Sequence, residues 1–204
     1  MCNLYTQTKS VDEIARIFRD LQMPLHFPEG APNLAARDIA ITDPGAIVRA
    51  SSAPAEAGAQ YDLLLRRWSW PGQNGRPVYN FRSDGREFSS GRCLILADGF
   101  YEFTTPADPK QKRKDRWLFA APDGSMLGIA GLARTTPDIG EAFTMLTTEP
   151  GPDVAPYHSR QVALIPQTDW KSWLNHSTPA AELIRPLPAG SLTVQSAMAQ
   201  PNLL

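Results

Sequence analysis

The sequence predicts a single α+β domain with a largely antiparallel, barrel-like β core flanked by short helices. Three observations support this fold class. Short runs with strand character outnumber the amphipathic helical segments. The two kinds of segment do not alternate regularly, as they would around a parallel sheet. No stretch is long and polar enough to separate two domains, so we expect one domain over residues 1–204.

The first expected element is an amphipathic helix near the start of the chain. Ser10 and Glu13 have the spacing of a capping box, in which each side chain bonds the backbone at the other position. Pro24 follows shortly after the end of the helical pattern, as is common beyond a helix C-terminus. The apolar residues at helical spacing between these signals are Ile14, Ile17, Phe18 and Leu21.

Most later elements are expected to be strands. Loops are expected at residues 30–37 and 53–58, and a tight turn at 122–125 predicts a hairpin. Near the C-terminus we expect short helices at 168–174 and 178–184, and a late strand at 191–195. The other expected strands are residues 46–50, 61–68, 93–103, 117–121, 126–132, 143–148 and 162–165.

Composition limits the possible functions. A net charge of −1 gives no general attraction for nucleic acid, so DNA binding would need a local basic patch. The basic run at residues 110–116 is one candidate, and a solvated loop is the alternative. The sequence shows no membrane-spanning run, no signal-peptide pattern and no metal-ligand spacing. We therefore expect a monomeric cytoplasmic protein that uses no metal or other cofactor and does not bind a membrane.

The residue with the most distinctive chemistry is Cys2, directly after Met1. Aminopeptidases normally remove Met before a residue as small as Cys, which would leave Cys2 with a free α-amine and a thiol. Such an amine can condense with an aldehyde to a Schiff base, and the thiol can then close onto the imine carbon to give a thiazolidine. The alternative is that residue 2 is simply part of an unstructured start.

Other polar residues occur where a plain apolar core would not accommodate them. Glu102 ends an apolar run between two aromatic residues, and such surroundings raise the pKa of a carboxyl group toward the range of a general acid or base. An exposed Glu at a strand end is the alternative. The remaining candidates could each be explained as turn, structural or surface residues; they are Asn80, Arg82, His158 and Arg160.

Taken together, these segments resemble the abasic-site processing family, the proteins built on the SOS response-associated peptidase (SRAP) domain. The matching motifs follow the family order across almost the whole chain, and the longest is the most specific. They lie at residues 1–5 (MCNLY), 80–83 (NFRS), 92–102 (RCLILADGFYE), 130–132 (AGL), 143–148 (FTMLTT) and 158–160 (HSR). The resemblance implies recognition of abasic sites in single-stranded DNA and covalent attachment through an N-terminal cysteine.

The resemblance also implies a role for each matching residue. Cys2 would supply the amine and thiol, and Asn80 would hold the reacting sugar or that amine. Glu102 would assist opening of the sugar ring and formation of the imine, and His158 would move a proton at the sugar hydroxyl or the imine. The arginines would bind phosphates and the tryptophans would stack on bases, with core packing as the alternative for at least one tryptophan; the expected DNA-contacting residues are Arg82, Arg160, Ser83, Trp68 and Trp70.

The implied function is to shield the lesion, because closure to a thiazolidine removes the imine that would otherwise permit strand cleavage. The family name also implies peptidase-like chemistry at Cys2, with lyase chemistry and crosslink reversal as further possibilities. Two other functions remain open: an N-terminal-nucleophile peptidase or amide hydrolase, and a non-catalytic relative that binds single-stranded DNA. The sequence departs from the family pattern at Asp84, Leu96, Phe103, Gln161 and Val162.

Overall fold

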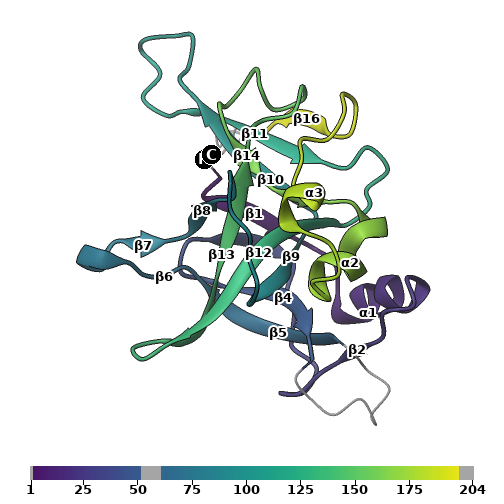
Figure 1. Cartoon of the computed structure of the whole chain (residues 1–204). Coiled ribbons are helices and arrows are strands. Elements are labelled where there is room, and N and C mark those ends of the chain that lie inside the picture. Colours follow the sequence, from purple (N-terminus) through teal and green to yellow (C-terminus); the bar gives the residue numbers. More distant parts are fainter. Residues whose placement is uncertain (1, 52–60, 198–204) are drawn as a thin grey trace.

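The computed structural model describes residues 2–51 and 61–197. In this part of the chain, two large sheets share one core, and three α-helices pack outside them (Figure 1). Most neighbouring strands run antiparallel. This architecture confirms the predicted α+β fold with a barrel-like core. None of the helices in the described ranges is long and apolar enough to cross a membrane.

The smaller of the two large sheets contains the N-terminal strand. All of its strands are antiparallel to their neighbours. In spatial order, the strands are β16 (Thr193–Ser196), β11 (Asp115–Ala120), β10 (Gly99–Thr104), β1 (Leu4–Gln7) and β3 (Arg37–Ala40).

The larger sheet closes into a ring because β13 pairs with β12 on one side and, in parallel, with β5 on the other. In order around the ring, the strands are β13 (Gly140–Thr148), β12 (Leu127–Thr136), β9 (Arg92–Ala97), β4 (Pro44–Ala50) and β5 (Tyr61–Trp68). The short strands at its edges are β2 (Leu25–His26), β8 (Asn80–Arg82), β14 (Gln161–Val162) and β15 (Leu164–Ile165). A separate pair is formed by β6 (Trp70–Pro71) and β7 (Pro77–Val78).

Successive residues of the ring strands face two different apolar clusters. Ile47 and Ile95 belong to the cluster between the two large sheets, which also contains Cys2. Their neighbours Val48 and Leu94 face the cluster beneath the helices. Every residue of β9 is buried, since both of its faces are covered. This burial explains why the sequence of β9 after Arg92 is a continuous apolar run instead of an alternating one.

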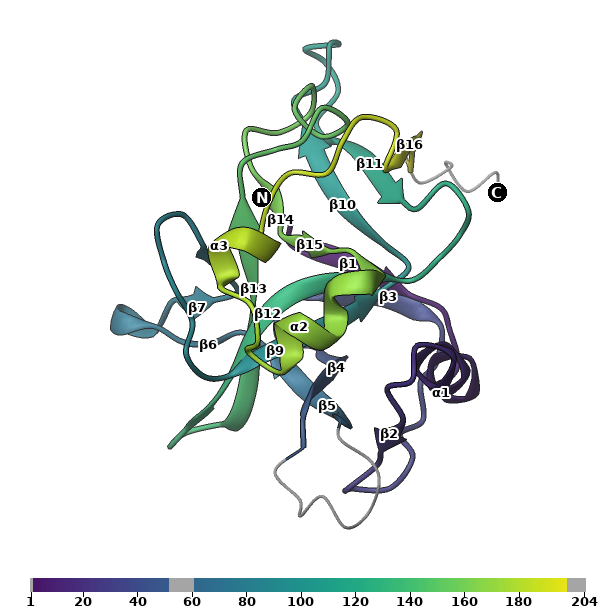
Figure 2. The same cartoon turned by 45° about the vertical axis from the view of Figure 1, so that its right-hand side comes forward.

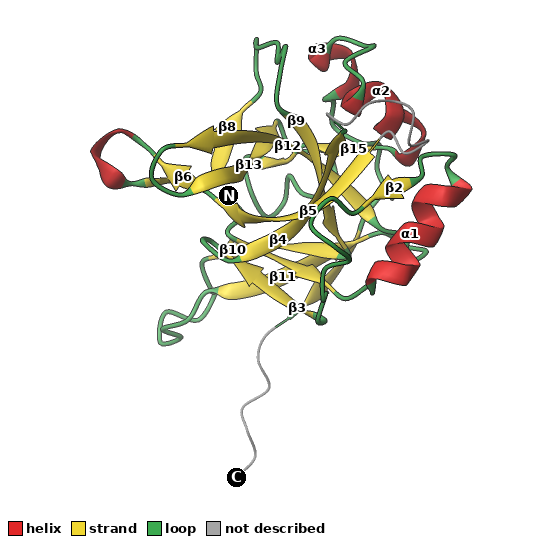
Figure 3. Cartoon of the chain, turned by 90° about the horizontal axis from the view of Figure 1, so that it is seen from below, coloured by secondary structure: helices red, strands yellow, loops and turns green. Residues whose placement is uncertain are grey.

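The helices lie together on the outer side of the ring (Figures 2 and 3). Both halves of the predicted capping box, at Ser10 and Glu13, are present at the first helix. Trp173 donates from Nε1 to the backbone oxygen of Cys93 at 2.9 Å, which attaches the second helix to β9. The three helices are α1 (Val11–Asp20), α2 (Trp170–Leu174) and α3 (Ala180–Leu183).

Most expected strands are confirmed, with shifted bounds. The strand expected at 93–103 is two strands, because the chain passes from β9 in the ring to β10 in the other sheet at Asp98. The strand expected at 162–165 likewise divides into β14 and β15. The loop expected at 30–37 ends where β3 begins, and the loop expected at 53–58 lies outside the described residues.

The predicted hairpin at 122–125 is wrong. A turn is present, and the backbone N–H of Gly124 donates to the oxygen of Ala121 at 3.0 Å. However, β11 before the turn pairs with β10 and β16, whereas β12 after the turn pairs with β9 and β13. The turn therefore passes the chain from one sheet to the other, a distinction that turn residues alone do not carry. The expected C-terminal helices and strand correspond to α2, α3 and β16.

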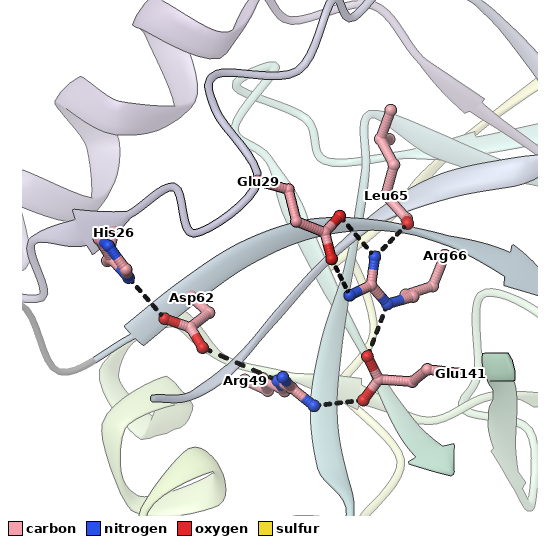
Figure 4. A network of polar contacts seen from close by, with 7 residues as sticks. All are labelled: His26, Glu29, Arg49, Asp62, Leu65, Arg66 and Glu141. Atoms are coloured by element: carbon pink, nitrogen blue, oxygen red, sulfur yellow. Dashed lines mark hydrogen bonds and ion pairs between the residues drawn. The ribbon is translucent and has the colours of Figure 1, made fainter. Parts of the chain in front are cut away.

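A charged network connects β2, β4, β5 and β13 (Figure 4). Asp62 is 3% exposed, and its carboxylate lies 3.1 Å from Nδ1 of His26 and 3.9 Å from Nε of Arg49. Glu141 pairs with Arg49 and lies 2.6 Å from Nε of Arg66. Loss of one partner would leave a poorly solvated charge, so the network favours this arrangement of the strands.

Candidate active site

Cys2 lies just before β1 and is 1% exposed, within the cluster between the sheets. Its Sγ donates to the backbone oxygen of Leu4 at 3.2 Å. Burial, and secondly the charge of Glu102, raise the pKa of the Cys2 thiol to about 12. The thiol is therefore protonated near neutral pH, unlike the low-pKa thiolates of cysteine nucleophiles.

Glu102 lies in β10 and is also 1% exposed, so the alternative of an exposed strand end is wrong. Burial raises the pKa of its carboxyl group to about 7, and a hydrogen bond with the backbone of Cys2 acts in the opposite direction. A carboxyl group that titrates near neutral pH can both accept and release a proton under those conditions. It does so beside the backbone nitrogen that would become the α-amine once Met1 is removed.

Asn80 begins β8 and contacts Cys2 from another element. Its Nδ2 donates to the backbone oxygen of Cys2 at 2.8 Å. Its Oδ1 is buried and has no hydrogen-bond partner among the described residues. β8 pairs in parallel with β13, and Asn80 lies opposite Met145. The ring of strands that contains β13 therefore positions the Asn80 amide. Asn80 thus fixes Cys2 and offers one unused acceptor beside it.

His158 lies in the loop between β13 and β14 and is half-buried. Nδ1 of His158 lies 3.0 Å from the backbone nitrogen and 3.0 Å from the backbone oxygen of Arg160, so it can accept a hydrogen bond from the first or donate one to the second. Burial lowers the pKa of the imidazole, which favours its neutral form. The adjacent Tyr157 packs on Trp117, whose ring centroid is 4.9 Å away. Trp117 is the cross-strand partner of Glu102, and this contact connects the His158 loop to the Glu102 strand.

The predicted phosphate ligands have different surroundings. Arg82 is exposed at the end of β8. The side chain of Arg160 is 13% exposed, and its guanidinium is held by Asp84, with Nη1 to Oδ1 at 3.0 Å and Nη2 to Oδ2 at 2.7 Å. Ser83 and Arg160 both donate to the backbone oxygen of Thr147, at 2.9 and 2.8 Å. Arg82 is thus open to a phosphate, whereas Arg160 already binds a carboxylate.

The predicted stacking residues are buried. Trp68 has no exposed surface, and its Nε1 donates to the backbone oxygen of Tyr79 at 2.8 Å. Trp70 is 5% exposed, and the guanidinium of Arg134 lies 4.1 Å from its ring centroid. Trp68 is therefore a core residue, and neither tryptophan ring offers an open face to a base in this conformation.

Trp117 and Tyr157 are two residues beside the site that the sequence did not predict as site residues. Both are half-buried and lie beside the elements that carry Glu102 and His158. Their proximity depends on the pairing of β10 with β11 and on the path of a distant loop, so no local signal could have indicated it.

The arrangement favours amine chemistry over thiolate chemistry. Asn80 and Glu102 contact the Cys2 backbone from two strands, and the carboxyl group of Glu102 titrates near neutral pH. Among the described residues, no group of three or more His, Cys, Asp or Glu side chains is placed to hold a metal ion.

Comparison with known proteins gives one family match. The model of the family described as SOS response associated peptidase (SRAP) matches residues 1–200. No curated protein matches the sequence.

Solved structures with the same fold cover nearly the whole chain. A protein from Bordetella bronchiseptica has a TM-score of 0.68 and 22% identity, over 97% of this chain and 100% of the other. A protein from Bacteroides thetaiotaomicron has a TM-score of 0.70 and 15% identity, over 96% and 91%. A phage-related protein from Bordetella bronchiseptica has a TM-score of 0.69 and 18% identity, over 97% and 95%. At these identities the likeness concerns the fold.

Proposed function

Because the chain belongs to the SOS response associated peptidase family, we propose that it binds abasic sites in single-stranded DNA covalently through Cys2. Family membership supports a role linked to DNA lesions and the SOS response, with a possible enzymatic part in DNA processing. The observation that carries the finer proposal is the contact of Cys2 with both Asn80 and Glu102. We further propose that the protein acts as a single-domain monomer on damaged DNA in the cytoplasm.

In the proposed reaction, removal of Met1 leaves the nitrogen of Cys2 as a primary amine beside Glu102. The abasic deoxyribose opens to its aldehyde, and the amine attacks the aldehyde carbon to give a carbinolamine. Glu102 in its acid form protonates the departing hydroxyl, which leaves as water, and an imine remains. Asn80 holds Cys2 through its backbone oxygen, and its unused Oδ1 is available to the amine or to the sugar.

The thiol acts second. Its pKa of about 12 means that little thiolate is present at neutral pH, so direct attack by sulfur is a poor first step. Once the imine has formed, Sγ adds to the imine carbon, the thiol proton moves to the imine nitrogen, and a thiazolidine ring closes. One water is lost overall. Loss of the imine removes the species that undergoes β-elimination, so the DNA strand stays intact.

The other proposed residues bind DNA or move protons. We propose that His158 acts at the sugar hydroxyl or at the imine through its imidazole. Arg82 and Arg160 bind the phosphates beside the lesion, Arg160 after exchanging the carboxylate of Asp84 for a phosphate. Ser83, bonded to the same carbonyl as Arg160, positions the end of β8 along this path.

Intact mass spectrometry tests the proposal. Protein that begins at Cys2 is incubated with a single-stranded oligonucleotide carrying one abasic site, without reductant. The expected product survives denaturation and has the mass of protein plus oligonucleotide minus one water. Cys2→Ser and Cys2→Ala are the matched controls: both keep the α-amine, so both should give adducts only after borohydride reduction of the imine.

A stable adduct formed equally well by Cys2→Ala without reductant would eliminate the thiazolidine step. No adduct from wild-type protein confirmed to begin at Cys2 would eliminate the proposed function. The N-terminal-nucleophile hydrolase is less well supported, because it requires an activated thiolate and the Cys2 thiol is buried and protonated.

A further inference from the structure

Trp117 lies directly beside the proposed acid. In the antiparallel pairing of β10 with β11, Trp117 is opposite Glu102, so both side chains emerge on the same face of the sheet. Cβ atoms of such partners are typically about 4.5–5.5 Å apart. The Nε1 of Trp117 donates to Oγ1 of Thr104 at 2.9 Å, which fixes the orientation of the indole. The ring is half-buried, so part of it borders solvent next to the site.

Tyr157 continues this aromatic surface toward His158. Its ring centroid lies 4.9 Å from that of Trp117, with an interplanar angle of 58°. Phe119 supports the tyrosine ring in an edge-to-face contact at 5.4 Å, and Phe119 itself is fully buried. Tyr157 is half-buried and directly precedes His158 in the chain. The two rings therefore connect the strand of the proposed acid with the loop of the proposed proton carrier.

A basic loop leads into the same surface. Residues 105–114 connect β10 with β11, and their basic side chains are exposed. Arg116 is not part of this set, because its guanidinium lies 3.8 Å from the Tyr101 ring centroid and pairs with Asp38. The charge of Lys114 adds to the effect of burial in lowering the pKa of His158, so the loop's charge reaches the site. The exposed basic residues are Lys110, Lys112, Arg113 and Lys114.

We propose that Trp117 and Tyr157 form the stacking surface for the nucleobase next to the abasic sugar, and that the 110–114 loop binds phosphates on that side. The inference rests on the proposed function and adds the residues that select the flanking nucleotide. Grooves for single strands combine basic side chains along the backbone with aromatic rings for the bases, and here both occur together. These rings take the stacking role that the buried Trp68 and Trp70 cannot fill in this conformation.

The test removes the base instead of the protein ring, so the wild-type fold is untouched. Tetrahydrofuran, a base-free sugar without an aldehyde, serves as a non-reacting lesion mimic in a fluorescently labelled single-stranded oligonucleotide. A second tetrahydrofuran then replaces the nucleotide on the 5′ side or on the 3′ side of the lesion. Wild-type affinity, measured by anisotropy, should fall about 5-fold to 100-fold when one particular side loses its base, and change little for the other.

Protein variants then identify the ring. Trp117→Leu should bind all three oligonucleotides with similar affinity, whereas Trp117→Phe should keep most of the difference. Phe103→Leu is the matched control, because Phe103 is a half-buried aromatic residue beside Glu102 on the opposite face of β10. This control should retain the wild-type dependence on the flanking base. Thermal melting of each variant verifies that the fold is retained.

Two outcomes would overturn the inference. One is wild-type binding that ignores the flanking base on both sides; the other is a folded Trp117→Leu variant that keeps the full wild-type difference. Failure of the proposed function is a separate result, seen when wild-type protein gives no covalent product with an oligonucleotide that carries a genuine abasic aldehyde. A crosslinking protein that ignores flanking bases would thus reject only the stacking surface.

Discussion

At the scale of single residues, Glu102 places a titratable group where an apolar one would be more stable. The carboxyl group is 1% exposed, and burial raises its pKa from 4.5 to about 7. Because the folded state holds the proton more tightly than the unfolded state, stability decreases as pH rises from about 4.5 to about 7. The full cost, about 3 kcal/mol, applies above pH 7 and is absent below about 4.5.

Glu102→Gln should therefore stabilise the chain that begins at Met1 while impairing its mature form in crosslinking. We expect a higher melting temperature for the variant at pH 8 and nearly equal melting temperatures at pH 4.5, as measured by calorimetry. In the mature form, the rate of adduct formation should fall about 10²- to 10⁴-fold, since the amide cannot transfer a proton. A variant that melts below wild type at pH 8 would show that the carboxylate stabilises the fold, which is the opposite of the expected effect.

The sequence indicated which residues of the site carry chemistry, but not how they are buried. Cys2, Asn80 and Glu102 were predicted from residue type and from the family motifs, and the structure brings them into contact. The sequence does not determine the burial of Glu102, because an apolar run does not reveal which face of its last residues is covered. Trp117 and Tyr157 were not predicted as site residues. They are far apart in the sequence, and only the pairing of β10 with β11 and the path of the loop that carries Tyr157 bring their rings together.

At the scale of elements, the passage from β9 to β10 determines where Glu102 points. The two strands belong to different sheets and meet at Asp98, whose backbone N–H donates to the oxygen of Thr6 at 2.8 Å. Its carboxylate accepts bonds from Thr8 and Lys9, so the crossing is attached to the segment after β1. Gly99 follows, and the backbone of β11 approaches it closely.

Gly99→Ala should weaken both the fold and the site. An added Cβ would lie 2.7 Å from the backbone oxygen of Phe119 and 2.7 Å from Cδ1 of Leu118, and the carbonyl cannot move without shifting β11. Overpacking of this kind typically costs about 1–3 kcal/mol. We expect a lower midpoint in urea denaturation and slower adduct formation than wild type, because β10 carries Glu102.

Gly124→Ala is the comparison for steric crowding, since nothing lies within 4 Å of a Cβ at that position. Its φ of +71° adds a conformational cost of about 1–2 kcal/mol but no clash. If Gly99→Ala were no less stable than Gly124→Ala, the close approach of β11 would not limit this position.

The elements that the sequence predicted well are those with a long or regular pattern. The helix after Ser10 carries both a cap and an apolar stripe, and the strand at 61–68 is long and apolar, so both were found. The short strands β1, β3 and β8 were not predicted, because their sequences lack a clear strand pattern. Pairing with neighbouring strands holds them in the extended conformation. The pattern of residues 93–103 predicts one strand because both of its halves are apolar, although Asp98 and Gly99 mark the crossing.

At the scale of the whole molecule, a net charge of −1 means that DNA is attracted only by local groups. Arg82 is exposed at the end of β8, and its charge, after the hydrogen bond and charge of Arg160, helps to lower the pKa of Asp84. Arg160, nearby through the Thr147 carbonyl, is held by Asp84 with two contacts. The carboxylate of Asp84 therefore binds the guanidinium of Arg160 as a phosphate would, so a DNA phosphate has to displace this carboxylate.

The salt dependence of DNA binding should report this difference. For single strands, each neutralised phosphate contributes about −0.7 to the slope of log K against log salt concentration. Arg82→Gln should make the slope shallower by about 0.7, because one phosphate contact is lost. Asp84→Asn should raise the affinity at low salt and steepen the slope by up to about 0.7, because Arg160 then meets phosphate without a competitor. Anisotropy titrations with an oligonucleotide carrying a tetrahydrofuran lesion measure both slopes without crosslinking.

Arg19→Gln provides a matched loss of charge for these titrations. Arg19 is exposed in the last turn of α1, and the helix packs on the outer side of the ring, away from the cluster that contains Cys2. Its removal changes the net charge as Arg82→Gln does, so an effect of Arg82→Gln alone would be local. Weaker binding by Asp84→Asn would mean that Asp84 orients Arg160 for DNA, and the competition between carboxylate and phosphate would then be rejected.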